Sequence, residues 1–162
     1  MDDAFDPADT TWTPVSAKLR AMRRMILVGA LAAFALVVAG IAVAASLPYI
    51  GVGGAVVVGI VTAVGWRWIG RNQRAWGYTE RDDDLLVRRG VAFRELIVVP
   101  YGRMQFVDVT DGPVQRRFGL STVQLHTAAA KTDARIPGLT PSEAARLRDR
   151  LTARGESHAA GL

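Results

Sequence analysis

The sequence has no cysteine and only two histidines, His126 and His158. Without cysteine the chain forms no disulfide and offers no thiolate as a nucleophile or metal ligand. Two histidines that lie far apart, with no cysteine to join them, do not have the spacing of a zinc site. We therefore expect no metal and no cofactor.

Charged side chains are absent from two long apolar stretches, residues 25–47 and 50–66. As a helix the first stretch would be about 34 Å long, which exceeds the roughly 30 Å of a hydrocarbon core. The second stretch would form a helix about 26 Å long, and the arginine and tryptophan side chains that flank it can reach the membrane interface. We predict a transmembrane helical hairpin over residues 18–75, with spans at about 25–47 and 50–69.

Basic residues flank both stretches, whereas the connecting residues 47–51 carry no charge. The flanking residues are Lys18, Arg20, Arg23, Arg24, Arg67, Arg71 and Arg74. By the positive-inside rule they place both termini in the cytoplasm. Attraction to anionic lipid is a second role for them and is compatible with the first. A signal peptide does not explain the first stretch, because it is longer than an h-region and a second span follows.

Both predicted spans are rich in small residues, which let helix backbones approach closely. These residues are Ala32, Ala33, Gly40 and Ala44 in the first span and Gly51, Gly54, Gly59 and Gly65 in the second. They favour packing within the hairpin, and contacts in a homo-oligomer are the alternative.

The net charge of +5 and the pI near 10.4 raise the question of nucleic-acid binding. However, residues 75–162 hold 13 Lys and Arg against 11 Asp and Glu, so most of the excess lies next to the spans. We predict no nucleic-acid partner.

Residues 1–17 are polar and acidic and contain two prolines, so we expect a disordered cytoplasmic tail whose Trp12 touches the membrane interface.

From residue 76 the pattern changes to short β-rich runs with a period of two, separated by turn residues. We expect seven strands, at residues 76–79, 85–89, 94–99, 104–110, 114–118, 122–127 and 134–136. Asp111-Gly112 indicates a hairpin turn, and Pro100 indicates a bulge or an edge strand. Sequential antiparallel pairing is expected.

A helix is predicted after the strands. Thr140 can cap it, Pro141 suits its first position and Glu143 closes a capping box. Its apolar face comprises Ala144, Leu147 and Leu151. Gly155 should end it, which leaves residues 156–162 as a tail. The predicted fold class is therefore an α+β membrane protein in which the hairpin precedes a small antiparallel β domain, residues 76–155, with a C-terminal helix. This is the outline of a PH-like barrel or sandwich, and the pattern alone fits other small barrels as well.

Three segments of the sequence resemble a known family. They are residues 99–107 (Val-Pro-Tyr-Gly-Arg-Met-Gln-Phe-Val), Gly112-Pro113 with Arg117-Phe118-Gly119-Leu120, and Val123 to Thr127-Ala128. They are similar to the YdbS-like bacterial pleckstrin-homology proteins, and the resemblance covers about residues 20–154. The typical motif positions of that family correspond to Pro100, Arg103, Gln105, Arg117, Gly119, Leu120, Thr127 and Ala128.

The resemblance implies a pair of transmembrane helices that lead into a domain of PH-like fold. For most members it implies no defined biochemical activity. A larger relative with several such domains is often encoded beside members of this family, which implies a hetero-complex in the membrane as one setting.

Some residues are of types found in catalytic or metal sites, but the motifs that accompany such sites are missing from the sequence. Ser121, His126 and Asp108 are the residue types of a nucleophilic triad, but no nucleophile elbow or glycine-rich oxyanion segment accompanies them. The run Asp82-Asp83-Asp84 falls in a predicted turn, and no glutamate completes a calcium loop. We therefore predict that the protein is not an enzyme.

Arginines of the predicted domain suit phosphate groups, and a PH-like fold suggests a lipid headgroup. They are Arg88, Arg89, Arg94, Arg103, Arg116, Arg117 and Arg135. Phosphoinositide-binding PH domains usually present Lys or Arg around their first hairpin, whereas here that hairpin is predicted at residues 80–84 and is acidic. We therefore expect no specific phosphoinositide binding. Arg103 lies on the same side of its strand as Gln105, which favours a structural tie to a neighbouring strand over ligand binding.

The sequence thus predicts a bacterial inner-membrane protein whose two-helix hairpin holds a cytoplasmic PH-like domain at the membrane. The predicted function is that of a non-catalytic protein-binding or scaffolding subunit. The alternative is a direct sensor or binder of anionic lipid headgroups. The expected partners are the lipid bilayer and another membrane protein, such as a larger relative with several PH-like domains. Formation of a homo-oligomer is a further alternative.

Overall fold

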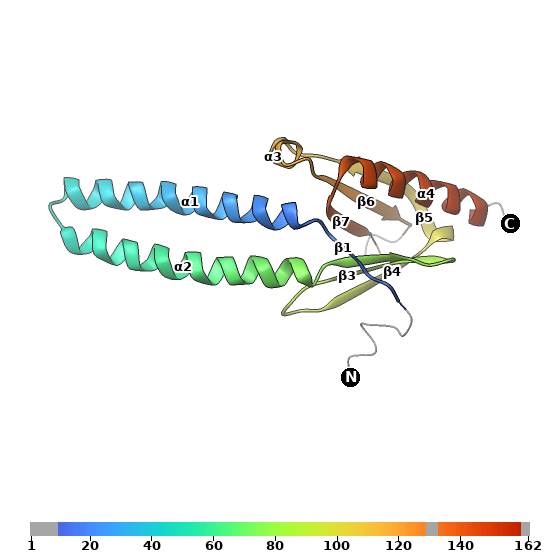
Figure 1. Cartoon of the computed structure of the whole chain (residues 1–162), viewed down its shortest axis with the longest axis horizontal. Helices are drawn as coiled ribbons and strands as arrows, with labels where there is room; N and C mark the ends of the chain where they lie inside the picture. Colours follow the sequence, from blue (N-terminus) through green and yellow to red (C-terminus); the bar gives the residue numbers. More distant parts are fainter. Residues whose placement is uncertain (1–9, 129–132, 160–162) are drawn as a thin grey trace. The chain divides into compact units, whose positions relative to one another are not determined.

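The computed structural model describes residues 10–128 and 133–159, which form two compact units (Figure 1). Residues 20–71 form the helical hairpin. The domain combines the segment that ends at Leu19 with the chain from Asn72 onward. Two apolar helices followed by antiparallel sheets and a C-terminal helix confirm the predicted fold class.

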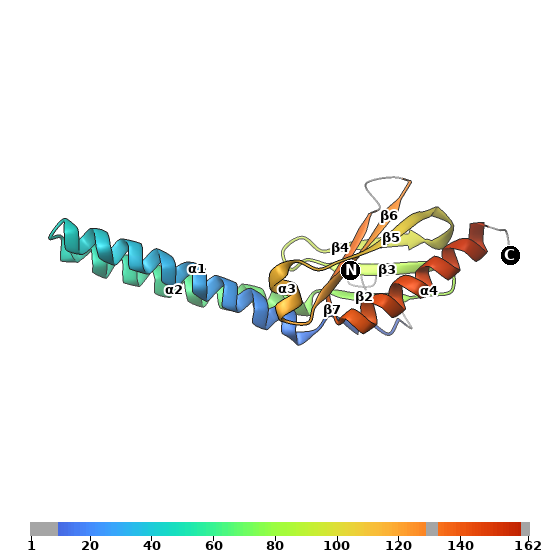
Figure 2. The ribbon, with the colours of Figure 1, turned by 90° about the horizontal axis from the view of Figure 1, so that it is seen from above.

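The hairpin consists of the helices α1 (Ala17–Ala44) and α2 (Pro48–Arg74), which run side by side in Figure 1 and overlap in the view of Figure 2. Both are long and apolar enough to cross a membrane. At the end of α1, Leu47 N–H donates to the Ala42 carbonyl (2.9 Å) and Ser46 N–H to the Val43 carbonyl (3.1 Å). Ser46 has a φ of 54°, so this is a left-handed cap. The cap ends α1 at residue 44, three residues earlier than predicted.

Glycines of α2 let the two helices approach one another. A Cβ at Gly65 would lie 2.7 Å from Leu27 Cδ2, and one at Gly54 would overlap Val38. At Gly40 and Gly59, in contrast, no neighbouring described atom lies within 4 Å of the Cβ position. The first pair supports packing within the hairpin, as predicted. The second pair faces outward, together with the exposed residues Ala32, Ala33 and Ala44.

The strands of the domain form two sheets in which all neighbours are antiparallel. In order, the first contains β1 (Thr13–Pro14), β2 (Gly77–Glu80), β3 (Asp84–Arg89) and β4 (Glu95–Pro100), and the second contains β5 (Met104–Thr110), β6 (Ser121–Thr127) and β7 (Ala134–Leu139). The remaining elements are η1 (Tyr101–Arg103), α3 (Pro113–Arg117) and α4 (Pro141–Ala159). The described strands form two separate sheets, so the PH-like domain is open rather than a closed barrel.

The core of the domain is formed by both sheets and α4. The side chains buried deepest include Leu85, Val87 and Val99 of the first sheet, Leu120, Val123 and Leu125 around β6, and Ala144, Leu147 and Leu151 of α4. The apolar face of α4 is therefore the predicted one. The predicted capping box is also present, since Thr140 N–H donates to Glu143 Oε2 (3.0 Å) and Glu143 N–H donates to Thr140 Oγ1 (3.3 Å).

The N-terminal segment corrects the prediction of a disordered tail over residues 1–17. Residues 1–9 lie outside the described part of the chain. Residues 10–16 belong to the domain, because β1 pairs with β2 and the next residue after β1 is buried. Trp12, which we expected at the membrane interface, has its ring centroid 4.4 Å from the guanidinium of Arg88. The pairing partner of β1 lies some sixty residues away in sequence, so no local pattern reveals it.

Two further elements differ from the prediction. Residues 114–118 do not form a strand, because α3 occupies residues 113–117. The Gln115 side chain accepts from Gly112 N–H (3.0 Å) and donates to Thr122 Oγ1 (3.0 Å), which stabilises this short helix in place of a hairpin turn. The other difference is that α4 passes through Gly155 and continues to Ala159, while residues 160–162 lie outside the described part.

The acidic turn at residues 80–84 joins β2 to β3 in a tight antiparallel hairpin, as predicted. The two-residue strand β1 precedes it, but the connection from β1 to β2 consists of α1 and α2. The acidic turn is therefore the first β-hairpin turn of the domain.

Candidate functional site

Strand β5 forms an edge of its sheet. Among the described residues β5 pairs only with β6, so the backbone groups along its other side have no strand partner. Such an edge can accept an added strand from another chain. Its side chains are also accessible, and Phe106 is 52% exposed. β5 is therefore the part of the second sheet that is open to a ligand.

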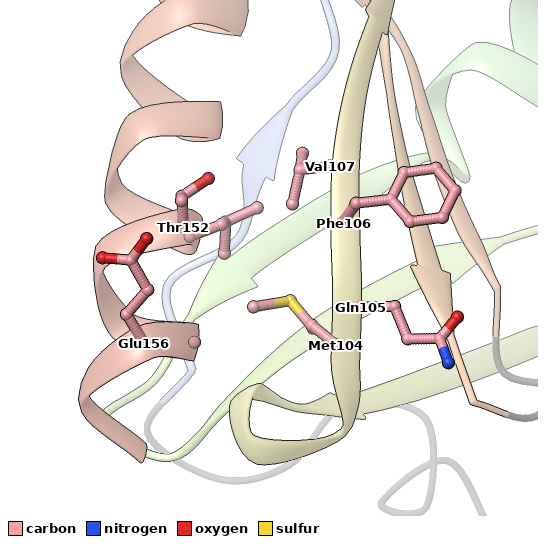
Figure 3. Close-up of a pocket in the computed structure, with 8 residues that line it drawn as sticks. Met104, Gln105, Phe106, Val107, Thr152 and Glu156 are labelled. Atoms are coloured by element: carbon pink, nitrogen blue, oxygen red, sulfur yellow. The ribbon is translucent and has the colours of Figure 1, made fainter. Parts of the chain in front are cut away.

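A groove of about 220 Å³ runs between β5 and α4. It is lined by Met104, Gln105, Phe106 and Val107 of β5 and by Leu151, Thr152, Gly155 and Glu156 of α4. Figure 3 shows Met104 and Val107 pointing toward α4, while Phe106 and Gln105 point away from it. A strand added beside β5 would therefore direct alternate side chains into this groove.

At Gly155, α4 lies close to the start of β5. A Cβ there would be 3.4 Å from Met104 Cε and 3.7 Å from the Tyr101 carbonyl oxygen. Tyr101 is buried, its hydroxyl donates to the Arg81 carbonyl (3.0 Å) and it accepts from Arg154 (3.2 Å). Burial raises the pKa of Tyr101, which further favours the neutral phenol. The buried Tyr101 and its two hydrogen bonds thus stabilise this end of the groove.

On the opposite face of β5, Phe106 stacks on His126 of β6, with the ring centroids 4.4 Å apart. The imidazole lies between two carboxylates: its Nε2 is 3.8 Å from Asp108 Oδ2 and its Nδ1 is 3.2 Å from Asp133 Oδ2. Thr127 N–H donates to Asp133 Oδ1 (2.9 Å), and this bond holds the pKa of Asp133 below its ordinary value. These contacts fix the side chain of Phe106 beside the free edge.

Of the three residue types of a nucleophilic triad, His126 and Asp108 lie close together (3.8 Å), but Ser121 does not join them. Ser121 begins β6 and is buried, whereas His126 lies five residues further along the same strand. Five residues of strand correspond to about 16 Å. Among the described residues no group of three or more His, Cys, Asp or Glu is placed to hold a metal ion.

Asp82 and Asp83 are exposed in the turn between β2 and β3, and the half-buried Asp84 begins β3. Asp84 lies 3.6 Å from Arg81, and Asp83 lies 3.5 Å from His158 of α4. These aspartates are thus part of surface ion pairs, which contribute little to stability.

The eight motif residues of the family resemblance fall into two groups at opposite ends of the β5–β6 pair. One group is Pro100, Arg103, Gln105, Thr127 and Ala128, and the other is Arg117, Gly119 and Leu120. Arg103 lies in η1 rather than in the strand, and its backbone carbonyl accepts from Ala128 N–H (3.4 Å). Gly119 has a φ of 61° and Leu120 is buried, so both have evident structural roles.

The basic residues that flank the spans lie near the polar ends of α1 and α2. Lys18, Arg67, Arg71 and Arg74 are exposed, and Arg20, Arg23 and Arg24 are half-buried. The guanidinium of Arg24 lies 4.1 Å from the ring centroid of Trp66 and donates to its carbonyl (3.5 Å). An arginine on a tryptophan suits the membrane–water interface.

The α4 side of the groove was not predicted. Leu151 and Gly155 are four residues apart, so they share a helix face, and Thr152 and Glu156 form the neighbouring row. This spacing is visible in the sequence once α4 is extended beyond residue 155.

Comparison with known proteins agrees with this architecture. A family model described as Bacterial PH domain matches residues 24–155, which include both apolar helices and most of the domain. The UPF0699 transmembrane protein YdbS of Bacillus subtilis (strain 168) is 34% identical over 79 residues. The match covers 49% of this chain and 48% of that protein, so the chain spans about half the length of this relative. No solved structure matches. The transmembrane relative and the two apolar helices support a location in a membrane.

Proposed function

Because the chain belongs to the bacterial PH domain family, we propose that it is a non-catalytic, membrane-anchored module that binds an extended segment of another membrane protein. In this proposal the hairpin holds the module in the bacterial inner membrane, and the domain and both termini lie in the cytoplasm. The protein then acts as a scaffolding subunit.

The observation that carries the proposal is the free edge of β5 beside the groove with α4. An added strand gains main-chain hydrogen bonds from the edge, and its alternate side chains gain specificity from the groove. Met104 and Val107 offer apolar contact inside the groove, and Phe106 offers it on the other face. Glu156 and Asp108 add negative charge on either side of β5. The expected segment therefore alternates apolar residues and carries a basic residue.

Anchoring makes a weak contact of this kind useful. A partner in the same membrane is confined to a thin layer next to the domain, which raises its effective concentration well above that in solution. A module that buries only a short strand can then bind without the large interface that a soluble pair needs.

The test is affinity purification at native expression level in mild detergent, followed by mass spectrometry. Thr152→Trp fills the groove, and Ala153→Trp is the matched control because Ala153 is the adjacent exposed residue of α4 outside the groove. We expect a membrane protein that co-purifies with the wild type and with Ala153→Trp but is lost with Thr152→Trp. A photoreactive residue at position 152 should cross-link the same protein.

Three results would contradict the proposal. One is a partner that both tryptophan variants retain. Another is a partner that a hairpin fragment, residues 1–75, retains without the domain, since binding would then occur through the spans. A clean species with no partner from native cells would also count against a scaffold.

The alternative function is direct sensing or binding of anionic lipid headgroups, and the two motif arginines do not form one phosphate site for it. Arg103 precedes β5 and Arg117 follows it, so the seven-residue strand separates them. Seven residues of strand span about 23 Å, which is too far for both guanidinium groups to bind one phosphate group.

A further inference from the structure

Strand register identifies the end of the domain that is connected to α1 and α2. β1 leads into α1 and β2 begins three residues after α2, and Pro14 of β1 pairs with Gly77 of β2. Gly77 also pairs with Arg88 of β3, close to the end of that strand. The connection between β3 and β4, residues 90–94, therefore lies at this same end, which we call the hairpin-side end.

Helix α3 also lies at the hairpin-side end. Ser16, just before α1, donates its N–H to the Gly138 carbonyl (3.0 Å). The next residue, Leu139, pairs with Ser121 at the start of β6. α3 immediately precedes that strand, and Leu120 N–H donates back to the Gln115 carbonyl of α3 (2.9 Å). Two separate connections thus meet where the chain enters and leaves the domain.

Both connections carry exposed apolar side chains among arginines. Phe93 is 91% exposed and Val114 is 42% exposed. The basic residues at this end are Lys18, Arg74, Arg88, Arg89, Arg94, Arg116 and Arg117. Two carboxylates beside these connections are each paired, Glu95 with Arg89 (2.8 Å) and Asp111 with Arg116 (3.1 Å). The hairpin-side end is therefore strongly basic.

The opposite end of the domain carries charges of both signs, because Arg150 lies 3.4 Å from Glu80 and Arg81 lies 3.6 Å from Asp84. It carries the acidic turn with Glu80 and the aspartates at residues 82–84. The groove lies near this end, because Tyr101, which anchors it, donates its N–H to the Asp83 carbonyl (3.1 Å), and His158 of α4 lies against the Asp83 carboxylate. The excess of positive charge thus lies at the hairpin-side end.

The chain allows little distance between the hairpin-side end and the lipid. Leu19 is packed in the domain and Met25 begins the apolar block, so six helical residues of about 9 Å separate the two. The headgroup layer on each side of a bilayer is about 5–8 Å thick. Side chains at the hairpin-side end therefore come within reach of headgroups.

The loop of residues 90–94 is shaped so that Phe93 projects. Gly90 has a φ of 94°, and a Cβ at this position would overlap the Phe93 carbonyl. The turn therefore requires glycine. An aromatic residue held out at a loop tip beside arginines has the chemistry of a contact with an anionic bilayer surface.

We propose that the hairpin-side end is a second membrane contact, in which Phe93 and Val114 enter the headgroup layer and the surrounding arginines pair with the phosphates of anionic lipid. This contact orients the domain. The acidic turn and the groove then face away from the membrane, toward a partner.

The test uses the full-length protein in nanodiscs and a spin label on an introduced cysteine, because the chain has none of its own. Ala92→Cys places the label beside Phe93 without replacing it, and Asp83→Cys reports on the acidic turn. In discs of equal parts phosphatidylglycerol and phosphatidylcholine, the label at residue 92 should collide severalfold less with a water-soluble nickel chelate than the label at residue 83. Adding Phe93→Ser should remove this protection, and its high exposure means that the domain still folds.

A label at residue 92 that is as accessible to nickel as the label at residue 83 would overturn the proposal, and would leave Phe93 as a contact for a protein. Equal protection in discs of pure phosphatidylcholine would overturn the assignment to anionic lipid. Neither result depends on whether the groove binds a partner, so the two proposals are tested separately.

Discussion

Gly155 of α4 and Met104 of β5 lie so close that a Cβ on Gly155 would touch Met104 Cε at 3.4 Å. This is ordinary van der Waals contact, so alanine fits without displacing the strand. Glycine is unfavourable inside a helix, and here the available space does not require it. It leaves the groove open instead.

Gly155→Ala should stabilise the domain by about 0.5–1 kcal/mol, because alanine in a helix interior loses less conformational entropy than glycine. The same change narrows the groove and should weaken binding of the partner. Thermal unfolding in mild detergent measures the first effect and co-purification measures the second. A loss of stability would contradict the contact described here.

Leu19 should contribute to the stability of the domain although it lies in the first turn of α1. It is 1% exposed, and a Cβ at Gly138 would come within 2.9 Å of its Cβ. Leu19→Ala removes a buried side chain and should cost about 2–5 kcal/mol. The neighbouring Lys18 is exposed, so Lys18→Ala should change stability by less than about 0.5 kcal/mol. Equal melting temperatures for the two variants would show that this segment does not fold with the domain.

Much of the fold follows from local pattern, and the misses have a common cause. The two apolar blocks, the capping box at Thr140 and the apolar face of α4 depend on residues close in sequence, and each was predicted. β1 has two residues and depends on a partner beyond the hairpin. α3 is a five-residue helix, too short for a helical period to show.

The candidate sites were harder to predict for the same reason. The groove requires α4 to pack beside β5, some forty-five residues earlier in the chain. The family resemblance marked Gln105 and Arg103 near the groove but none of its α4 side. The basic hairpin-side end combines two connections that are distant in sequence, and only strand register brings them together.

The hairpin offers a test that separates packing of α1 on α2 from contacts between chains. A Cβ at Gly51 would lie 3.5 Å from Ala42 Cβ, which suits a disulfide. Ala42→Cys with Gly51→Cys should therefore oxidise within one chain, in a protein that otherwise lacks cysteine. Adding Gly54→Leu should reduce this cross-link because Val38 occupies the space, whereas Gly53→Leu should not. Cross-linked dimers on a gel would favour contacts in a homo-oligomer instead.

The capping box of α4 should make stability depend on pH in a defined direction. Thr140 donates from its backbone N–H and its hydroxyl to the Glu143 carboxylate, and these bonds lower the pKa of Glu143. The folded state thus favours the ionised form. When the pKa of a carboxyl group is lower in the folded state, the group adds to the free energy of unfolding at pH values above its ordinary pKa. This contribution is lost as the pH falls through the pKa of the folded state.

Glu143→Gln should therefore destabilise the domain at pH 7 by about 0.3–1 kcal/mol, since it removes a negative charge at a helix N-terminus. The difference from the wild type should shrink as the pH falls below about 4. Glu156→Gln is the matched control: it removes the same charge from the C-terminal part of α4, where the helix dipole does not favour it. Unfolding in mild detergent between pH 3 and pH 7 measures both. A difference that is constant with pH would mean that the ionised Glu143 is not what caps α4.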